Sequence, residues 1–446
     1  MRKILLIGAG RSSSSLIKYF LDHSSAENWM LVVADFSEEL AQSKIDNHPM
    51  AKAIGFDIQN ENQRTNLVSE ADIVISMLPA DMHLPVALEC LKQKKNLITA
   101  SYVSTEMNEL SQGVANAGLI FLNECGLDPG LDHMSAMAII DDILIKGGSM
   151  KAFRSYTGGL VAPESNDNPW GYKFSWNPRN VILAGQGTAK YIENGFYKYT
   201  PYSRLFTEIQ NITVDGIGSF DGYANRDSLS YRKLYHLDSI QTMIRGTLRQ
   251  SGYCKAWNVF VQLGLTDDTF KIENSEKLTY KSMVEAFLPS YIKGKNIEER
   301  LSKFVNLPAD GKEIQMVKWT GILNDDVIGI SNASPAQILQ HLLEEKWRLK
   351  SFDKDMIVMQ HQFEYILNEK NIFHTSSLVV EGENSIQTAM AKTVGTPVAI
   401  AARLILNGKI VMKGVQIPTH RSIYEPILIE LKQFGISFVE KQKESA

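Results

Sequence analysis

The sequence is poor in cysteine, with three in 446 residues. Cys90, Cys125 and Cys254 lie far apart and form neither a CxxC pair nor a zinc-ligand spacing. The sequence therefore predicts no disulfide framework and no metal centre. Such sparing use of cysteine is typical of proteins in a reducing compartment, so we expect a cytoplasmic protein.

Long apolar runs and an excess of one charge are also missing. Eighteen apolar residues never follow one another, so no membrane-spanning helix is expected. Forty-six Lys and Arg face 50 Asp and Glu, which gives a formal net charge of −4. That balance provides no basic surface for nucleic acid or for an anionic membrane, and we expect neither as a partner.

Short apolar runs alternate with helical patterns in the first third of the chain. The runs are Ile4–Ile7, Met30–Val33, Ile73–Leu78, Leu97–Thr99 and Leu119–Leu122. Short strands buried on both faces and joined by helices are typical of parallel βαβ units. The pattern predicts an α/β fold with a Rossmann-type doubly wound parallel sheet.

The first run leads directly into a glycine turn and a helix. The first glycine permits a tight turn, and the second lets the backbone approach a pyrophosphate at the helix N-terminus. Ser13 replaces the third glycine of the dinucleotide fingerprint, so a plain strand-to-helix turn stays possible. The predicted cofactor contacts here are Gly8, Ala9, Gly10, Arg11 and Ser12.

An acidic residue, Asp35, ends the second run about 25 residues after Gly10. A carboxylate there accepts hydrogen bonds from ribose hydroxyls and repels a 2′-phosphate, so Asp35 favours NAD over NADP. Arg11 is close enough in sequence to leave NADP possible. Asp35 would otherwise cap the segment that follows it.

The loops after the third and fourth runs lie at the same edge of the predicted sheet. Ligands of open parallel sheets bind at the carboxyl ends of the strands. We therefore place Leu78, Ala100, Ser101 and Tyr102 beside the nicotinamide. Without a ligand, the two hydroxyls would serve as a helix cap and a packed ring.

Residues 123–133, "NECGLDPGLDH", form an unusual turn. Pro129 fixes its own φ and restricts the residue before it, while the flanking glycines allow strained angles. The turn aims Asp128, with Glu124 and His133 nearby, above the sheet edge. Asp128 as a plain turn residue and His133 as a buried cap are the alternatives.

Six sequence blocks in chain order carry a family resemblance. They are "ITASYVS" (98–104), "NECGLDPGLDH" (123–133), "SYTGGLVAPESNDNPWGYKFSWNPR" (155–179), "ANRDSLSYRKLY" (224–235), "IRGTLRQSGY" (244–253) and "TAMAKTVGTPVAIAARLIL" (388–406). Together they resemble the saccharopine reductase family, the glutamate-forming saccharopine dehydrogenases. The resemblance extends from Gly8 to about Phe438.

The resemblance implies three domains and a homodimer. A dinucleotide-binding domain over 1–130 is completed by 390–446, and a mixed α/β substrate and dimerisation domain over 131–265 is completed by 350–389. An all-helical domain over 266–349 is inserted into the second. Apolar residues at helical spacing over 283–288, 297–304 and 336–349 agree with that insertion.

The resemblance also implies a reaction. Saccharopine is a secondary amine with three carboxylates. Hydride leaves its glutarate carbon for the dinucleotide, and the imine is hydrolysed to glutamate and 2-aminoadipate 6-semialdehyde. Guanidinium groups suit such a substrate because their planar fork binds carboxylates bidentately.

The site residues implied by the family fall into two groups. The substrate contacts are Ser101, Tyr102, Asp128, Thr157, Lys173, Arg226, Thr247, Leu248 and Arg249. For catalysis, Asp128, which is also an expected cofactor contact, is the first choice for arranging the amine and the hydrolytic water, and Tyr102 and His133 are the alternatives behind it.

Some residues depart from the family pattern. Thr157 stands where the family commonly has cysteine, so a thiol contact is lost, and Cys125 is expected to be a small buried filler. Fungal members use NADP with a basic residue after the second strand, where this chain has Asp35.

Other interpretations stay open. Taken alone, Arg245 and Arg249, four residues apart, would fit the solvated face of a helix. Two other function classes are a reductive-condensation enzyme of the carboxynorspermidine synthase type and a non-catalytic nucleotide-binding homologue.

Overall fold

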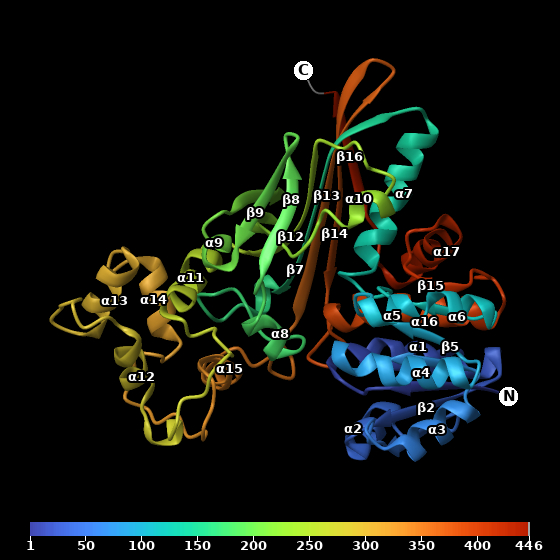
Figure 1. Ribbon diagram of the computed structural model, residues 1–446, viewed down its shortest axis with the longest axis horizontal. Coiled ribbons are helices and arrows are strands. Elements are labelled where there is room, and N and C mark those ends of the chain that lie inside the picture. The colour runs from blue at the N-terminus through green and yellow to red at the C-terminus, as the bar shows by residue number, and fades with distance from the viewer. Residues whose placement is uncertain (445–446) are drawn as a thin grey trace.

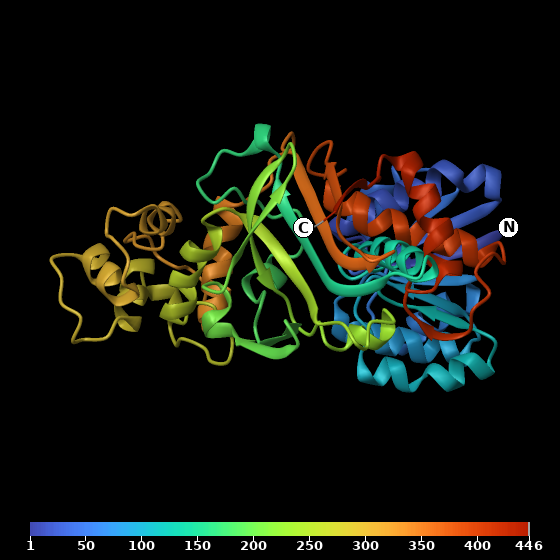
Figure 2. The same ribbon diagram turned by 90° about the horizontal axis from the view of Figure 1, so that it is seen from above.

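The computed structural model describes residues 1–444 and has three regions along its longest axis (Figure 1). A seven-stranded parallel sheet with its helices lies at one end, a nine-stranded mixed sheet in the middle, and a group of short helices at the other end. Seen from above, the short helices lie far from the N-terminus (Figure 2). The predicted α/β class is confirmed.

The seven-stranded sheet has the order β15-β6-β5-β4-β1-β2-β3, with every pair parallel. Its strands are β1 (Arg2–Ile7), β2 (Trp29–Asp35), β3 (Ala51–Gly55), β4 (Ile73–Ser76), β5 (Asn96–Thr99), β6 (Ile120–Leu122) and β15 (Gly414–Gln416). The order 3-2-1-4-5-6 within it is that of a doubly wound sheet, so the Rossmann-type prediction is confirmed. The strands β3 and β15 were not predicted from the sequence, because they are short and contain polar residues.

Helices cover both faces of this sheet. They are η1 (Arg11–Ser13), α1 (Ser14–Glu27), α2 (Glu38–Ile45), α3 (Glu61–Glu70), η2 (Ala80–Met82), α4 (His83–Lys92), α5 (Thr105–Glu109), α6 (Ser111–Asn116), α16 (Ala389–Leu406), α17 (Arg421–Leu431) and η5 (Lys432–Phe434). Two of them, α16 and α17, come from the far end of the sequence, so the sheet is covered by segments that are distant along the chain.

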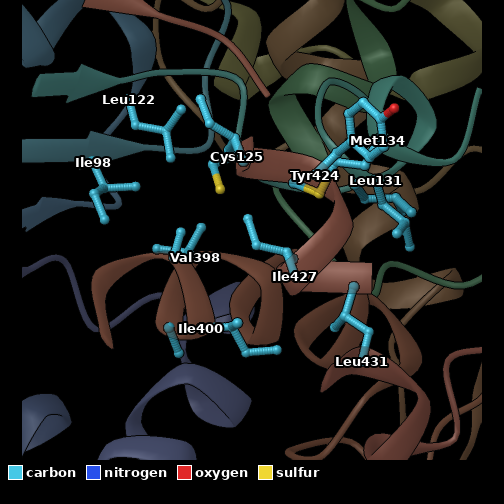
Figure 3. Close-up of a cluster of buried hydrophobic side chains, with 14 of the residues drawn as sticks. Ile98, Leu122, Cys125, Leu131, Met134, Val398, Ile400, Tyr424, Ile427 and Leu431 are labelled. Carbon is cyan, nitrogen blue, oxygen red and sulfur yellow. The ribbon is translucent and has the colours of Figure 1, made fainter. Parts of the chain in front are cut away.

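The helix α16 is long and apolar enough to cross a membrane by length and composition, yet 78% of it is buried inside the protein. Its Val398 faces the sheet side chains Ile98 and Leu122, whereas Ile400 points to the opposite side of the helix (Figure 3). This packing makes α16 a core helix of the parallel sheet.

The nine-stranded sheet runs β10-β11-β12-β7-β13-β14-β16, and a β8–β9 hairpin joins it at β12. Its strands are β7 (Ser149–Val161), β8 (Thr188–Glu193), β9 (Phe196–Pro201), β10 (Gln210–Val214), β11 (Gly218–Ala224), β12 (Thr242–Gln250), β13 (Asp355–Leu367), β14 (Lys370–Glu381) and β16 (Val439–Glu444). The long strands β13 and β14 pair antiparallel over almost their whole length. The last strand, β16, pairs with β14 here although the sequence analysis grouped 390–446 with the parallel sheet.

The remaining helices connect or extend this sheet. They are α7 (Leu131–Ile145), η3 (Pro163–Ser165), α8 (Pro178–Ile182), α9 (Tyr202–Leu205), α10 (Tyr231–Leu234), α11 (Tyr253–Leu263), η4 (Ser275–Lys277), α12 (Tyr280–Phe287), α13 (Ile297–Val305), α14 (Lys312–Trp319) and α15 (Pro335–Lys346). Ser334 and Gln337 form a capping box that starts α15, which explains the sharp onset of that helix. The three domain boundaries stay a prediction.

Candidate active site

The glycine turn lies at the carboxyl edge of the parallel sheet, directly after β1. Gly8 has a φ of +104°, and a Cβ there would lie 2.9 Å from the Met77 carbonyl oxygen, so only glycine fits. Above Gly10 there is open space, because an added Cβ would meet no atom within 4 Å. The Asp35 carboxylate accepts from the Ala9 N–H at 2.6 Å and holds the turn.

These residues fit a dinucleotide. The open side of Gly10, the start of η1 at Arg11 and Ser12, and the carboxylate of Asp35 supply the three features that a pyrophosphate and a ribose require. The Arg11 guanidinium donates to the carbonyl oxygen of Phe174 at 2.8 Å. Arg11 therefore connects the glycine turn to the segment before α8.

The next two loops border the same edge. Leu78 and Ala100 follow β4 and β5, and both are half-buried against the cores of the parallel sheet. The Ser101 hydroxyl lies 2.7 Å from Nε2 of His83. The sequence analysis did not select His83, because a single histidine at the start of a helix carries no motif.

The turn after β6 presents Asp128. Gly130 has a φ of +145°, and a Cβ there would lie 2.3 Å from the Gly126 backbone nitrogen, so the turn closes only with glycine. Asp128 Oδ1 accepts from the Tyr102 hydroxyl at 3.1 Å and from Arg245 Nη2 at 3.0 Å. The two predicted catalytic groups therefore touch each other and a guanidinium from the nine-stranded sheet.

The Arg245 guanidinium pairs with two carboxylates, Asp128 and Asp132, whose pKa values shift in opposite directions. Its Nη2 also donates to Asp132 Oδ2 at 2.7 Å. Burial, followed by the Asp132 carboxylate, raises the pKa of Asp128. Burial also pushes the pKa of Asp132 upward, but His133 and Arg245 outweigh it and hold that pKa below its usual range. A carboxyl pair whose pKa values are pushed apart is suited to acid–base chemistry.

Glu124 and His133 form a buried network behind Asp128. Glu124 Oε2 accepts from His133 Nε2 at 2.8 Å and from the Tyr231 hydroxyl at 2.9 Å, and Tyr235 contacts the other ring nitrogen. Burial opposes ionisation of Glu124, yet the hydrogen bond from His133 leaves its pKa lowered. These buried hydrogen bonds hold the turn that carries Asp128 in place.

The strand β12 carries a row of polar residues on one face. Residues two apart in a strand share a face, so that face carries Arg245, Thr247 and Arg249. Leu248 points to the opposite face, where it packs with Tyr156. The helix interpretation of the two arginines is wrong, because a spacing of four residues shares one face in a strand as well as in a helix.

Arg249 is a buried cation without a protein anion. It is 4% exposed, and its guanidinium lies over the rings of Tyr172 and Tyr253, 5.3 and 5.4 Å from the centroids. Among residues 1–444, no carboxylate pairs with it and its Nε has no hydrogen-bond partner. The opposite residue on β11, Asp221, accepts instead from the Gly252 N–H. A buried charge left unpaired is costly, so this site is built for an anion.

The other predicted substrate contacts occupy different surroundings. Thr157 lies beside Thr247 in register, on the same face of the sheet. Arg226 is exposed, and its guanidinium lies 5.2 Å from the Tyr102 ring centroid. Lys173 is buried and its ammonium pairs with Asp353 at 2.7 Å, as well as with a second aspartate. Arg226 therefore lies against Tyr102, whereas Lys173 is neutralised by protein carboxylates.

The buried ion pair between Lys173 and Asp353 leads to a prediction about stability. Lys173→Met leaves the Asp353 carboxylate, 3% exposed, without its cation. We expect a destabilisation of about 3 to 5 kcal/mol, because a buried charge has lost its partner. A lower thermal midpoint measures this destabilisation. Lys350→Met, which removes an exposed ion pair to Asp167, serves as the control and should leave the midpoint nearly unchanged. Equal midpoints for both variants would contradict the assignment.

Comparisons with known proteins agree with the resemblance. The family model described as the saccharopine dehydrogenase NADP binding domain matches residues 4–122, and the one described as the saccharopine dehydrogenase C-terminal domain matches residues 126–436. The Schizosaccharomyces pombe saccharopine dehydrogenase [NADP(+), L-glutamate-forming] is 32% identical over 449 residues, which cover 99% of both chains.

A longer relative and a solved structure extend the comparison. The mitochondrial alpha-aminoadipic semialdehyde synthase of Bos taurus is 34% identical over 98% of this chain, and the match covers 47% of that protein. The chain thus spans about half the length of such relatives. The apo saccharopine dehydrogenase (L-Glu forming) of Saccharomyces cerevisiae superposes with a TM-score of 0.88 at 31% identity, covering 99% of this chain and 100% of that one. The chain belongs to the saccharopine dehydrogenase family.

Proposed function

We propose that this protein is a saccharopine dehydrogenase (L-glutamate-forming) of lysine metabolism, which interconverts saccharopine with L-glutamate and 2-aminoadipate 6-semialdehyde. The observation that carries the proposal is the unpaired buried guanidinium of Arg249. It lies four residues along β12 from Arg245, a separation of about 13 Å at about 3.3 Å per residue. Because Arg245 is paired with Asp128 and Asp132, that distance separates the Arg249 anion site from Asp128, and it suits a long substrate with a carboxylate at Arg249 and its amine beside Asp128.

The residues at the rim have distinct tasks in this proposal. Asp128, with its raised pKa, exchanges a proton with the substrate amine, and Tyr102 holds the carboxyl group in place. Arg226 and Arg249 bind carboxylates. With the pyrophosphate at Gly10, the nicotinamide would lie beside Leu78 and Ala100 and would supply the hydride acceptor. The remaining polar groups of the proposed substrate site are the hydroxyls of Ser101, Thr157 and Thr247.

We propose that NAD is preferred over NADP. Asp35 ends β2, where a carboxylate accepts from ribose hydroxyls and repels a 2′-phosphate. The fungal relatives are named for NADP(+), and Lys44 Nζ lies 2.5 Å from the Gly10 carbonyl oxygen, so some use of NADP is expected. The preference rests on the charge of Asp35.

Asp35→Ser is expected to shift the ratio of NAD to NADP affinity by about tenfold toward NADP, the effect of one hydrogen bond to a charged group. Both affinities fall somewhat, since Asp35 also holds the Ala9 N–H, but their ratio isolates the ribose role. Dissociation constants for NADH and NADPH, measured by fluorescence, test this. Asp22→Ser, an exposed aspartate on α1, is the control. An unchanged ratio would refute the preference.

One assay tests the proposed function as a whole. Saccharopine is offered with NAD and then with NADP while the absorbance of the reduced nicotinamide is recorded. Formation of NADH together with glutamate supports the proposal. Turnover only with an aldehyde and a diamine would indicate the carboxynorspermidine synthase type, and binding of NADH without any turnover would indicate a non-catalytic homologue.

We also propose a homodimer in the cytoplasm. A groove on the surface of the nine-stranded sheet is lined by polar side chains such as Thr213 and Gln360 and by apolar ones such as Val214, Phe373 and Val379. The edge strand β16 is exposed along its length, which leaves it available for pairing. Light scattering of the purified chain measures the mass and so tests the dimer.

The cytoplasmic location is proposed because the three cysteines are free and buried, as suits a reducing compartment.

A further inference from the structure

His83 connects the core of the parallel sheet to the candidate site. It is the first residue of α4 and is 4% exposed. Its Nδ1 lies 2.8 Å from the hydroxyl of Ser76 in β4, and its Nε2 lies 2.7 Å from the hydroxyl of Ser101. The Thr99 hydroxyl is 3.2 Å from the same Nε2. The imidazole thus lies between a core serine and a serine at the rim.

The hydrogen-bond network assigns the tautomer of this ring. Ser76 is fully buried, and among residues 1–444 the only hydrogen-bond partner of its hydroxyl is His83 Nδ1. A buried hydroxyl proton needs an acceptor, and the two buried hydroxyls that could donate to the ring compete for opposite nitrogens. Ser76 lies 2.8 Å from Nδ1, closer than Thr99 at 3.2 Å from Nε2, so Ser76 donates to Nδ1. Burial lowers the pKa of His83 to about 4, so the ring is neutral at pH 7 and carries its one proton on Nε2.

The assigned tautomer fixes what Ser101 offers to a ligand. The Nε2–H donates to the Ser101 hydroxyl oxygen, its closer partner. Thr99 Oγ1 accepts from the Ser101 backbone N–H at 3.0 Å, which holds the loop in place. The Ser101 hydroxyl proton is then left for an oxygen atom outside this network.

A proton relay through His83 does not fit the geometry. A relay needs an outlet to solvent or to another titratable group, and the chain of hydroxyls ends at Ser76, which is 0% exposed inside the sheet. The ring therefore orients its neighbours.

We propose that His83 is a positioning residue that makes Ser101 a hydrogen-bond donor to an oxygen of the bound ligand. The inference rests on the proposed function. The acceptor oxygen belongs either to the nicotinamide carboxamide or to a substrate carboxylate, since both bind at this rim. Binding of NADH and the KM for saccharopine distinguish these two sources.

A double-mutant cycle tests the coupling. We expect Ser101→Ala and His83→Gln each to lower kcat/KM for saccharopine by about five- to tenfold, the loss of one hydrogen bond. The double variant should lose no more than either single one, because the two residues act as a unit. His341→Ala, an exposed histidine on α15, is the control. Multiplying losses would overturn the proposal. A weaker NADH affinity in Ser101→Ala assigns the carboxamide, and a raised saccharopine KM alone assigns the carboxylate.

A spectroscopic readout is independent of activity. In the wild-type protein labelled with nitrogen-15 histidine, we expect the His83 signal to show a protonated Nε2 and a bare Nδ1. The opposite tautomer, or a charged ring at pH 7, would overturn the proposal even if the double-mutant cycle fails through misfolding. An enzyme without saccharopine turnover but with the expected His83 signal would refute only the proposed function.

Discussion

Replacing Arg249 by methionine is expected to raise the KM for saccharopine by about 100-fold or more, the loss of two hydrogen bonds to a charged group. NADH affinity should stay unchanged, because the glycine turn lies in the other sheet. Methionine fills the space between the rings of Tyr172 and Tyr253 without a charge, so the free variant should be at least as stable as the wild type. Loss of substrate affinity with no loss of stability is characteristic of a ligand-binding cation.

Steady-state kinetics and a thermal midpoint measure the two effects. Arg154→Met is the matched control, because Arg154 lies on the opposite face of the same sheet and pairs with Glu364. Its KM should equal that of the wild type. A wild-type KM in Arg249→Met, or a lower midpoint without substrate, would remove Arg249 from the site.

Asp128→Asn is expected to lower kcat by about 100- to 10,000-fold, the usual contribution of general acid–base catalysis. Asparagine keeps the shape of the side chain and still accepts from Tyr102, so the fold and NADH binding should persist.

The pH dependence of kcat/KM adds a signed test of Asp128. Because burial and Asp132 raise the pKa of Asp128, the wild-type enzyme should lose activity as the pH falls through that raised pKa and the base becomes protonated. The Asn variant should lack this acidic limb. Asp142→Asn, an exposed aspartate on α7, is the control. Full turnover in Asp128→Asn would leave Asp128 as a turn residue.

Local patterns predicted the first sheet well. Five apolar runs became β1, β2, β4, β5 and β6, because parallel strands buried on both faces need continuous apolar residues. The three-residue strand β15 was missed, since its pairing with β6 depends on a contact about 290 residues away in the chain. The strand β16 was not predicted either, since it pairs with β14, about 60 to 70 residues before it in the chain.

The candidate site was predictable where a motif signals chemistry and unpredictable where pairing decides it. Tyr102 and Asp128 were selected from their turns, and they touch. The partners of Lys173 were invisible in the sequence, because Asp353 lies 180 residues away. His83 has no sequence signal, since its role follows from three hydroxyls that the fold brings together.

The position of α16 has a consequence for biosynthesis. The apolar side chains of β5 and β6 that Val398 covers, such as Ile98 and Leu122, are translated early, whereas α16 begins only at residue 389 (Figure 3). On the ribosome, this face of the parallel sheet must wait exposed until most of the chain has been synthesised. Nascent chains with such uncovered surface tend to aggregate and depend on chaperones.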